Sequence, residues 1–578
     1  MESSDQSEQY AWGPPHQGEV THVPAQALNS GGQQKLQQQL QQQQLQKQLQ
    51  LQLPLNAWFL DDGTQVGTLD QLKPVVEILQ AEGPALGLIL STAATVQAPA
   101  KPKSTIWCPT PHGEQEDPLG KGLVLVKEDG VVLLGAPLGN AMFEAEQIQR
   151  KVDKIKDITA SLPLLEDPHT EFVLLRSCLS LPKISFLLRA VDTSHHVPLL
   201  QEFDQVTREA LIRILGAPVD DRTWQQGKLP VAMGGLGLRA AEDHGPAAHA
   251  ASVLSAQMRV QDLVGGRQAA AEGEEEGVLQ PQLLVALSAA QGEQVREADL
   301  VGLTQRQMGI KVDQEQQRQL MGLVGEDEER EQARLLSLTL GHAGDWLNTP
   351  PLKALGLHLR PAEFVLALKY RLGMKVFDSA GPCPACLRES DEYGDHAMCC
   401  GAGGERISRH NNLRDAFFDT AVAAGLGPVR EGRFLLPGTD RRPADVLVPN
   451  WVGGKDAAMD VTIVTPLQAA TMPGAAQTAG HALNHAHGRK ANGAEEECRR
   501  QGIAFLPMVA ETFGGWHSSA EKEVKKLAAA LARHTGQDES EATSHLWGRL
   551  GILLQRGNAA ILGNRVPALP GSHIDGIL

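Results

Sequence analysis

The chain has 578 residues and a mass of 62.1 kDa, a length that predicts about three or four domains with cores of their own. Aromatic residues make up only 4% of it, while glycine (58) and proline (34) are plentiful, so helices and loops should outweigh aromatic-rich sheet. The net charge of −17 argues against a protein whose main task is to coat nucleic acid, because phosphate would repel the chain as a whole.

Residues 1–55 are a low-complexity leader with a glutamine tract over 33–52. Such a polar tract cannot bury enough apolar surface to offset chain entropy, so we expect disorder. The tract's leucines are irregularly spaced, which leaves a coiled coil as the less favoured alternative. No signal peptide opens the chain and no apolar run is long enough to span a bilayer, which predicts a soluble intracellular protein without a membrane partner.

Two adjacent acids follow the first apolar run. Ala57–Leu60 leads into Asp61, Asp62 and Gly63, the pattern of a strand running into a tight turn. Adjacent carboxylates on such a turn can hold Mg²⁺ for phosphoryl transfer, and an ordinary hairpin turn is the competing interpretation. Beyond the turn we expect a helix over 69–82, a short buried strand over 87–90, an apolar strand over 130–139 and helices throughout 140–260.

The middle of the chain changes composition twice. Residues 261–335 are rich in Glu, Gln and Ala, which predicts an acidic linker that is helical or partly disordered. Apolar periodicity returns over 336–404, where a helix is expected over 361–372. That helix delivers the chain to a cluster of cysteines.

The cluster has the spacing Cys383-x2-Cys386-x9-His396-x3-Cys400. A Cys-x2-Cys pair places two thiolates on one turn, and a later His/Cys pair can close a tetrahedron around zinc. Cys399 is a rival for the fourth ligand, and a metal-free reduced loop is the alternative for the whole segment. A site with four protein ligands is closed, so we expect the zinc to be structural rather than hydrolytic.

Two acids on short strands follow the cluster. A helix is expected from Ile407 to about Ala424, and strands over 444–448 and 457–464 place Asp445 and Asp460 next to each other. Acids on apolar strands are costly unless they are ligated or hydrogen-bonded, which favours a shared divalent ion over two structural strand-end acids. A helix over 481–501 and a strand over 503–509 complete the pattern.

The first half of the chain resembles the C-terminal half of a non-LTR retrotransposon reverse transcriptase. Phe59-Leu60-Asp61-Asp62 matches the aromatic-x-Asp-Asp motif of the palm, Leu134-Gly135 matches the primer-grip turn, and Leu229–Arg239 resembles the thumb and connector. A two-metal polymerase site needs a third carboxylate from an earlier strand. Before Asp61 the only aspartate is Asp5, so we expect that this chain does not polymerise DNA unaided.

The second half is similar to the zinc-binding segment and the PD-(D/E)xK restriction-like endonuclease of site-specific non-LTR retrotransposons. The resemblance implies that Asp445 and Asp460 bind Mg²⁺ or Mn²⁺. Thr462 stands where the general motif has its lysine, and in the retrotransposon branch the lysine comes from the following helix, which makes Lys490 the candidate. A second lysine often follows three residues later, where this chain has Gly493.

Arg409 and His410 stand at positions where this family contacts DNA or braces the zinc segment. Ordinary residues on a helix face are the competing interpretation for both.

These features predict an α+β multidomain chain: a partial reverse transcriptase palm with a helical thumb (56–260), a linker (261–335), a zinc knuckle (336–404), an α/β restriction-endonuclease-like core (405–535) and a C-terminal tail (536–578). The expected activity is metal-dependent nicking of target DNA, with element RNA as a further partner and the nucleus as the location that the resemblance implies. The alternatives are a catalytically inactive zinc-stabilised nucleic-acid-binding or scaffold relic, a reverse transcriptase completed by another chain, and a relic that does not fold.

Overall fold

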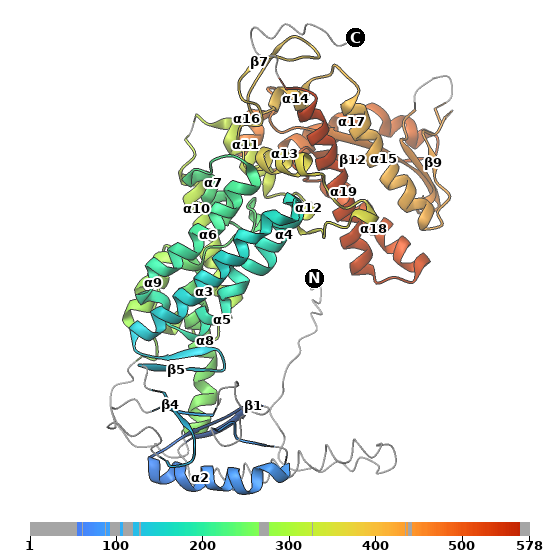
Figure 1. The fold of residues 1–578 in the computed structure, drawn as a ribbon. Coiled ribbons are helices and arrows are strands. Elements are labelled where there is room, and N and C mark those ends of the chain that lie inside the picture. Colours follow the sequence, from blue (N-terminus) through green and yellow to red (C-terminus); the bar gives the residue numbers. More distant parts are fainter. Residues whose placement is uncertain are drawn as a thin grey trace, which may run out of the picture. The chain divides into compact units, whose positions relative to one another are not determined.

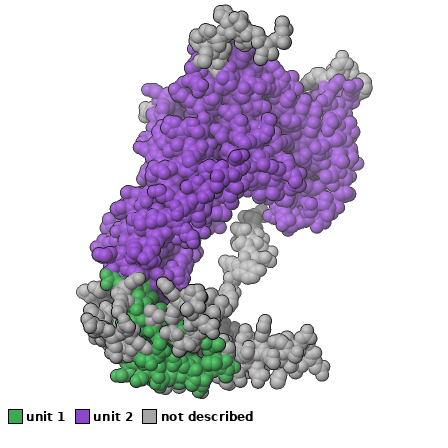
Figure 2. Space-filling view, viewed as in Figure 1, with its two compact units in different colours: residues 1–131 green, residues 132–578 purple. Residues whose placement is uncertain are grey.

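A computed structural model describes most of the chain beyond its leader. The described residues are 55–59, 62–86, 88–92, 104–107, 119–126, 129–264, 277–325, 327–433, 435–436 and 442–566. The glutamine tract and Asp61 therefore lie outside the described residues. The chain divides into two compact units, residues 1–131 and 132–578 (Figure 2).

The first unit contains a hairpin, a helix and a second pair of strands. Strands β1 (Leu55–Phe59) and β2 (Asp62–Val66) pair antiparallel, with Phe59 opposite Asp62. Helix α2 (Leu69–Glu82) matches its expected range and begins at a capping box formed by Thr68 and Gln71. Strands β3 (Thr105–Trp107) and β4 (Val124–Val126) pair in parallel.

The buried strand expected over 87–90 is wrong for the residues that are described there. Residues 88–90 follow a 3₁₀ turn (Gly83–Leu86) and pair with no strand in the described part of the chain. The Leu88 N–H donates to Gly83 O, and Ile89 is 68% exposed. The short apolar run folds back on the end of α2 instead of joining a ladder.

A hairpin and a body of helices follow. The strand expected over 130–139 is two strands, β5 (Gly130–Leu133) and β6 (Ala136–Gly139), joined by Leu134 and Gly135, both at positive φ. Two positive φ values in sequence match the right-handed twist of a two-residue hairpin. The helices expected over 140–260 are α3 (Ala141–Ser161), α4 (Pro168–Leu174), α5 (Leu181–Ala190), α6 (Val197–Leu215), α7 (Asp221–Lys228) and α8 (Ala241–Val264).

Residues 277–325 are helical as expected, but they are a packed part of the fold rather than a linker. Helices α9 (Pro281–Gln291) and α10 (Gln305–Gly322) share one buried apolar cluster with α8. Leu287 and Val312 are both fully buried in it. The two acids of α10, Asp313 and Glu315, are buried as well and pair with Arg239 and Arg318. The apolar positions of the helices supply the core. Helix α11 (Glu329–Leu338) follows.

A four-stranded sheet organises the C-terminal part, in the order β12-β11-β10-β9. Strand β10 (Val446–Val452) pairs antiparallel with β9 (Val429–Arg430) and with β11 (Lys455–Val464), and β11 pairs in parallel with β12 (Ala504–Glu511). Gly453 and Gly454, both at positive φ, turn the chain between β10 and β11.

Helices cover both faces of this sheet. Met508 and Ala510 pack in one cluster with α15 (Glu405–Ala423) and α18 (Ser518–Thr535), whereas Val509 packs with α17 (His481–Arg500). Neighbouring residues of a strand point to opposite faces, so α17 lies on the face away from α15 and α18.

The C-terminal tail expected over 536–578 is wrong for residues 539–563, which form the 25-residue helix α19 (Glu539–Gly563). Buried residues of α19 belong to three separate apolar clusters: Ile552, Leu554 and Leu562. Figure 1 shows α19 in dark red between α15 and α13 (Pro361–Arg371), and it also contacts α12 (Asp345–Asn348). Among the described residues, no helix combines the length and apolar character needed to cross a bilayer.

Candidate metal centres and the adjoining pocket

The Cys/His cluster forms a compact set of ligand atoms. Strands β7 (Gly381–Pro382) and β8 (Glu389–Ser390) carry Cys383 and Cys386 at their turn, and α14 (Asp395–Cys399) carries His396 and leads to Cys400. Their ligand atoms all lie within 4.8 Å of one another.

The spacing of these atoms suits a tetrahedral zinc ion. The two sulfurs of Cys383 and Cys400 are 4.0 Å apart, and Cys386 Sγ is 3.2 Å from His396 Nε2. A tetrahedron with zinc–sulfur bonds of about 2.3 Å has edges of about 3.8 Å. The expected Cys₃His group is therefore present and fits zinc.

The structure selects between the two rival cysteines. Cys400 belongs to the ligand group and Cys399 does not. Burial raises the pKa of the Cys399 thiol to about 11, so it stays protonated at neutral pH. Burial also acts on Cys383. Hydrogen bonds from the Ala385 and Cys386 N–H groups and from the His396 and Cys386 side chains together outweigh it and lower the pKa of that thiol to about 6, which favours the thiolate that a metal requires.

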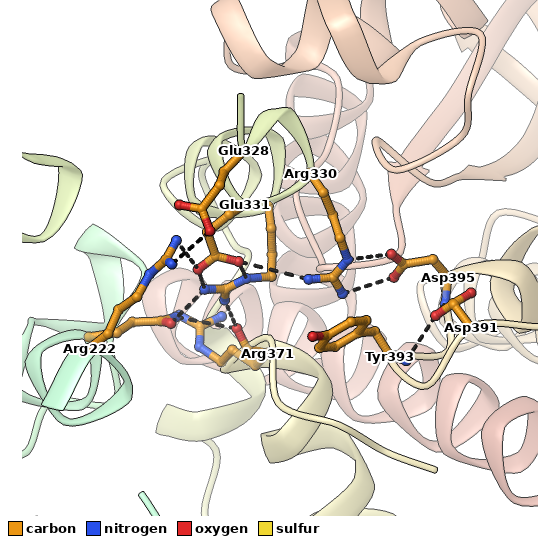
Figure 3. Close-up of polar contacts among 10 residues, drawn as sticks. Arg222, Glu328, Arg330, Glu331, Arg371, Asp391, Tyr393 and Asp395 are labelled. Carbon is orange, nitrogen blue, oxygen red and sulfur yellow. Dashed lines mark hydrogen bonds and ion pairs between the residues drawn. The ribbon is translucent and has the colours of Figure 1, made fainter. Parts of the chain in front are cut away.

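A polar network fixes the zinc segment to the helical body (Figure 3). Arg330 of α11 makes two hydrogen bonds to the Asp395 carboxylate, of 2.5 and 3.2 Å, and lies 4.2 Å from the centroid of the Tyr393 ring. On its other side Arg330 faces Glu331. Asp391 accepts a hydrogen bond of 2.7 Å from the backbone N–H of His396. Helix α14, which carries His396, is thereby held in place by protein contacts.

Asp445 and Asp460 lie opposite each other across β10 and β11. Val446 pairs with Met459, and the Asp445 N–H donates to Met459 O over 2.9 Å, so the register brings Asp445 opposite Asp460. Opposed residues of an antiparallel pair have Cβ atoms roughly 5 Å apart. Asp445 Oδ2 also accepts a hydrogen bond of 2.7 Å from the Val461 N–H.

Lys490 reaches the second acid from α17. Its Nζ lies 2.8 Å from Asp460 Oδ2, although nothing in local sequence brings these residues together. Burial raises the pKa of Asp460, Lys490 counteracts this, and the charge of Asp445 raises the pKa further. The two opposed carboxylates and the lysine thus form one charged group contributed by three elements.

His410 faces into this group rather than outward. Its Nε2 lies 3.1 Å from Asp445 Oδ2 and 3.0 Å from Val461 O. The hydrogen bond to Asp445 raises the pKa of the His410 imidazole, and burial opposes that rise.

Arg409, by contrast, is 2% exposed. Its Nη1 donates to Asn558 Oδ1 of α19 over 2.7 Å and lies 3.5 Å from Met398 Sδ in the zinc segment. These contacts join α15 to α19 and to the zinc segment, and they leave the guanidinium little exposed surface.

A pocket of about 390 Å³ opens between the zinc segment and the sheet. Sequence reasoning missed Arg406, which lines the pocket four residues before His410 on the same face of α15 and donates to Cys399 O over 2.9 Å. Thr462, at the usual place of the lysine, lines it too, with a buried hydroxyl that makes no hydrogen bond to the described residues. The lining residues are Gly401, Gly403, Arg406, Ile407, Arg409, His410, Asp460, Val461, Thr462, Ile463 and Lys490.

The polymerase-like motif is not brought into a described site. Asp61 lies outside the described residues, and of Asp62 only the backbone is described, in its pair with Phe59. Glu431, which precedes the two strands, forms ion pairs with Arg414 and, at 2.9 Å, with Arg442.

Comparison with known proteins relates part of this chain to a retrotransposon. Over 94 residues, 16% of the chain, it is 31% identical to the retrotransposable element SLACS 132 kDa protein of Trypanosoma brucei gambiense. The match covers 8% of that protein's length. No protein-family model matches the chain. The similarity supports a retrotransposon-related origin, and the chain holds a Cys₃His group that can bind zinc.

Proposed function

We propose that this retrotransposon-related chain contains a metal-dependent DNA endonuclease whose active site is the pocket lined by Asp460 and Lys490, with Asp445 opposite Asp460 on the neighbouring strand. One observation carries the proposal. Two carboxylates face each other across a hairpin, and a lysine from a separate helix lies 2.8 Å from one of them. Two carboxylates can bind a divalent ion and a lysine can stabilise negative charge, which are functions that metal-dependent phosphodiester cleavage uses.

Each residue has a definite task in this proposal. Asp445 and Asp460 hold the cation, and Lys490 stabilises negative charge that develops on the phosphate. When bound, Mg²⁺ or Mn²⁺ supplies Lewis-acid polarisation of the phosphate and a water of lowered pKa. Arg406, on the pocket wall, binds a phosphate of the DNA backbone.

The zinc group has a structural task. It fixes the loop with Gly401 and Gly403, which forms one wall of the pocket. The substrate is target DNA, the place of action is the nucleus, and element RNA is a further partner in this proposal. The net negative charge of the chain would repel DNA as a whole. The basic side chains that line the pocket still attract phosphate locally, even on an acidic chain.

The test is nicking of a supercoiled plasmid by the full zinc-loaded chain. We expect open-circular product with added Mg²⁺ or Mn²⁺, little without it, and its loss in Asp445→Asn. Asp415→Asn, an acid on α15 that pairs with Arg430 at 3.1 Å, is the control that keeps activity. A folded, zinc-loaded wild type that binds DNA without cutting it would favour the inactive zinc-stabilised binding protein instead.

A further inference from the structure

The ring of His410 donates a hydrogen bond to Asp445. Its Nε2 lies 3.1 Å from Asp445 Oδ2 and 3.0 Å from the carbonyl oxygen of Val461. An ionised carboxylate and a carbonyl can only accept hydrogen bonds, so Nε2 carries a hydrogen and shares it between these two oxygens. The two contacts therefore identify Nε2 as the donor nitrogen of the ring.

The same carboxylate oxygen has a second donor. The backbone N–H of Val461 donates to Asp445 Oδ2 over 2.7 Å. Both hydrogen bonds, one from α15 and one from β11, therefore go to Oδ2, and neither goes to Oδ1. Because a carboxylate is planar, fixing one of its oxygens restricts the direction of the other. Oδ1 is then the oxygen that Asp445 can offer to another partner.

The packing of α15 keeps the donor in place. Leu413 and Phe417, one and two turns further along the helix, are fully buried against the sheet. The other ring nitrogen, Nδ1, lies 3.3 Å from Asn411 Oδ1. Because the Nε2 hydrogen is shared between two protein oxygens, that nitrogen is not free to bind a DNA phosphate. The contacts of His410 thus suit a residue that acts through Asp445.

We propose that His410 is a positioning residue whose Nε2–H orients the Asp445 carboxylate, so that Oδ1 is the oxygen that takes the divalent cation. The inference rests on the proposed function and deepens it, since it names the side chain that prepares this acid for the metal. Hydrogen bonds to a metal-binding carboxylate orient it, and losing such a partner typically lowers metal affinity or activity by about 10–100-fold.

The test measures Mn²⁺ binding by the full zinc-loaded chain, from the electron paramagnetic resonance signal of free Mn²⁺. His410→Phe keeps a planar ring and removes the donor, so we expect the affinity for Mn²⁺ to fall by about 10–100-fold. The Mn²⁺ concentration that gives half-maximal plasmid nicking should rise by the same factor. Plasmid affinity without divalent cations should stay unchanged, because His410 does not bind the DNA in this proposal.

Three further variants separate the hydrogen bond from other effects. His410→Gln carries an amide N–H at about the reach of Nε2 and should restore most of the Mn²⁺ affinity. His410→Met also lacks a donor, covers the case in which His410→Phe does not fold, and should show the same loss. His485→Phe, at an exposed histidine of α17, is the control that should bind Mn²⁺ as the wild type does.

The outcomes distinguish this inference from the proposed function. Mn²⁺ binding that is lost in Asp460→Asn but unchanged in a folded donor-free variant of His410 would overturn the inference and leave the proposed function standing. An equal loss in His410→Gln would overturn it too, because the imidazole and not the hydrogen bond would then be responsible. Absence of any Mn²⁺ binding that depends on Asp460 would overturn both.

Discussion

Lys490 Nζ lies 2.8 Å from Asp460 Oδ2, an ion pair that joins α17 to β11 at the mouth of a polar pocket. The lysine is not in the strand that carries the acid, so the pair exists only because α17 packs across that face of the sheet. This relationship places a positive charge beside the Asp460 carboxylate.

Replacing Lys490 tests whether the pair has a chemical role. In Lys490→Met we expect plasmid nicking to fall by about 10²–10³-fold, the usual effect of removing one electrostatic stabiliser. Arg489→Met, the exposed neighbour on α17, removes the same charge and should retain activity within about twofold of the wild type. If both variants lost the same amount of nicking activity, the positive charge of the helix in general, and not the ion pair with Asp460, would account for the loss.

The zinc group predicts a contrast between neighbouring cysteines. Cys400→Ser removes a ligand, and its zinc affinity should fall by more than about tenfold, since even residues behind the ligands have effects of that size. Cys399→Ser should keep the metal, because that thiol lies outside the group. Zinc content after dialysis against a weak chelator measures both. Zinc loss from the Cys399 variant alone would reverse the ligand assignment.

A buried carboxyl predicts how stability depends on pH. Burial raises the pKa of Glu511 to about 7, although the Ser337 hydroxyl and the Leu483 N–H donate to it. Between about pH 4 and pH 7 the folded chain therefore keeps a proton that the unfolded chain has lost. The free energy of unfolding should fall as pH rises through this window, by up to about 3 kcal/mol from this group.

Glu511→Gln removes that titration. Urea unfolding at several pH values should show a smaller fall in the variant than in the wild type across the same window. Asp204, whose pKa burial also raises to about 7, should still contribute a fall in the variant. Identical pH profiles for the two proteins would rule out a protonated Glu511 in the folded chain.

The close contact between α19 and α15 predicts that Gly557 cannot be replaced by alanine without loss of stability. A Cβ at Gly557 would lie 2.5 Å from Arg409 Cγ and 2.8 Å from Arg409 Cβ, so one of the two helices would have to shift. Gly557→Ala should therefore destabilise the protein by about 1–3 kcal/mol, despite the better helix propensity of alanine. Gly488→Ala, in α17 with no atom within 4 Å of the new Cβ, should instead be neutral or stabilise by up to about 1 kcal/mol.

Strong local sequence patterns are sufficient to predict several structural elements. The periodic stretch over 69–82, with Thr68 as its cap, is α2, and the Gly453-Gly454 turn fixes a hairpin in which Asp445 and Asp460 face each other. The Cys-x2-Cys spacing likewise predicted a compact ligand group. In each case the residues that decide the structure are neighbours in sequence.

Contacts between segments that are distant in the sequence cannot be predicted from local patterns. The sequence predicts a tail where α19 lies, although Leu550, Leu554 and Ile561 have helical spacing, because nothing local shows that the core needs these residues. His410 was assigned to DNA or to bracing, and only the crossing of α15 over the sheet brings it to Asp445. The approach of Lys490 to Asp460 was expected from resemblance alone, and the catalytic role of that lysine stays a prediction.

The most direct measurement compares two aspartates of the same strand. Plasmid nicking by the full zinc-loaded chain is followed with Mn²⁺ for Asp460→Asn and for Asp456→Asn, whose carboxylate accepts only a backbone N–H, from Asn450 over 3.1 Å, among its described contacts. The account predicts that nicking disappears in the Asp460 variant and persists in the Asp456 variant. Nicking that survives in folded Asp460→Asn would contradict an active site at this pocket.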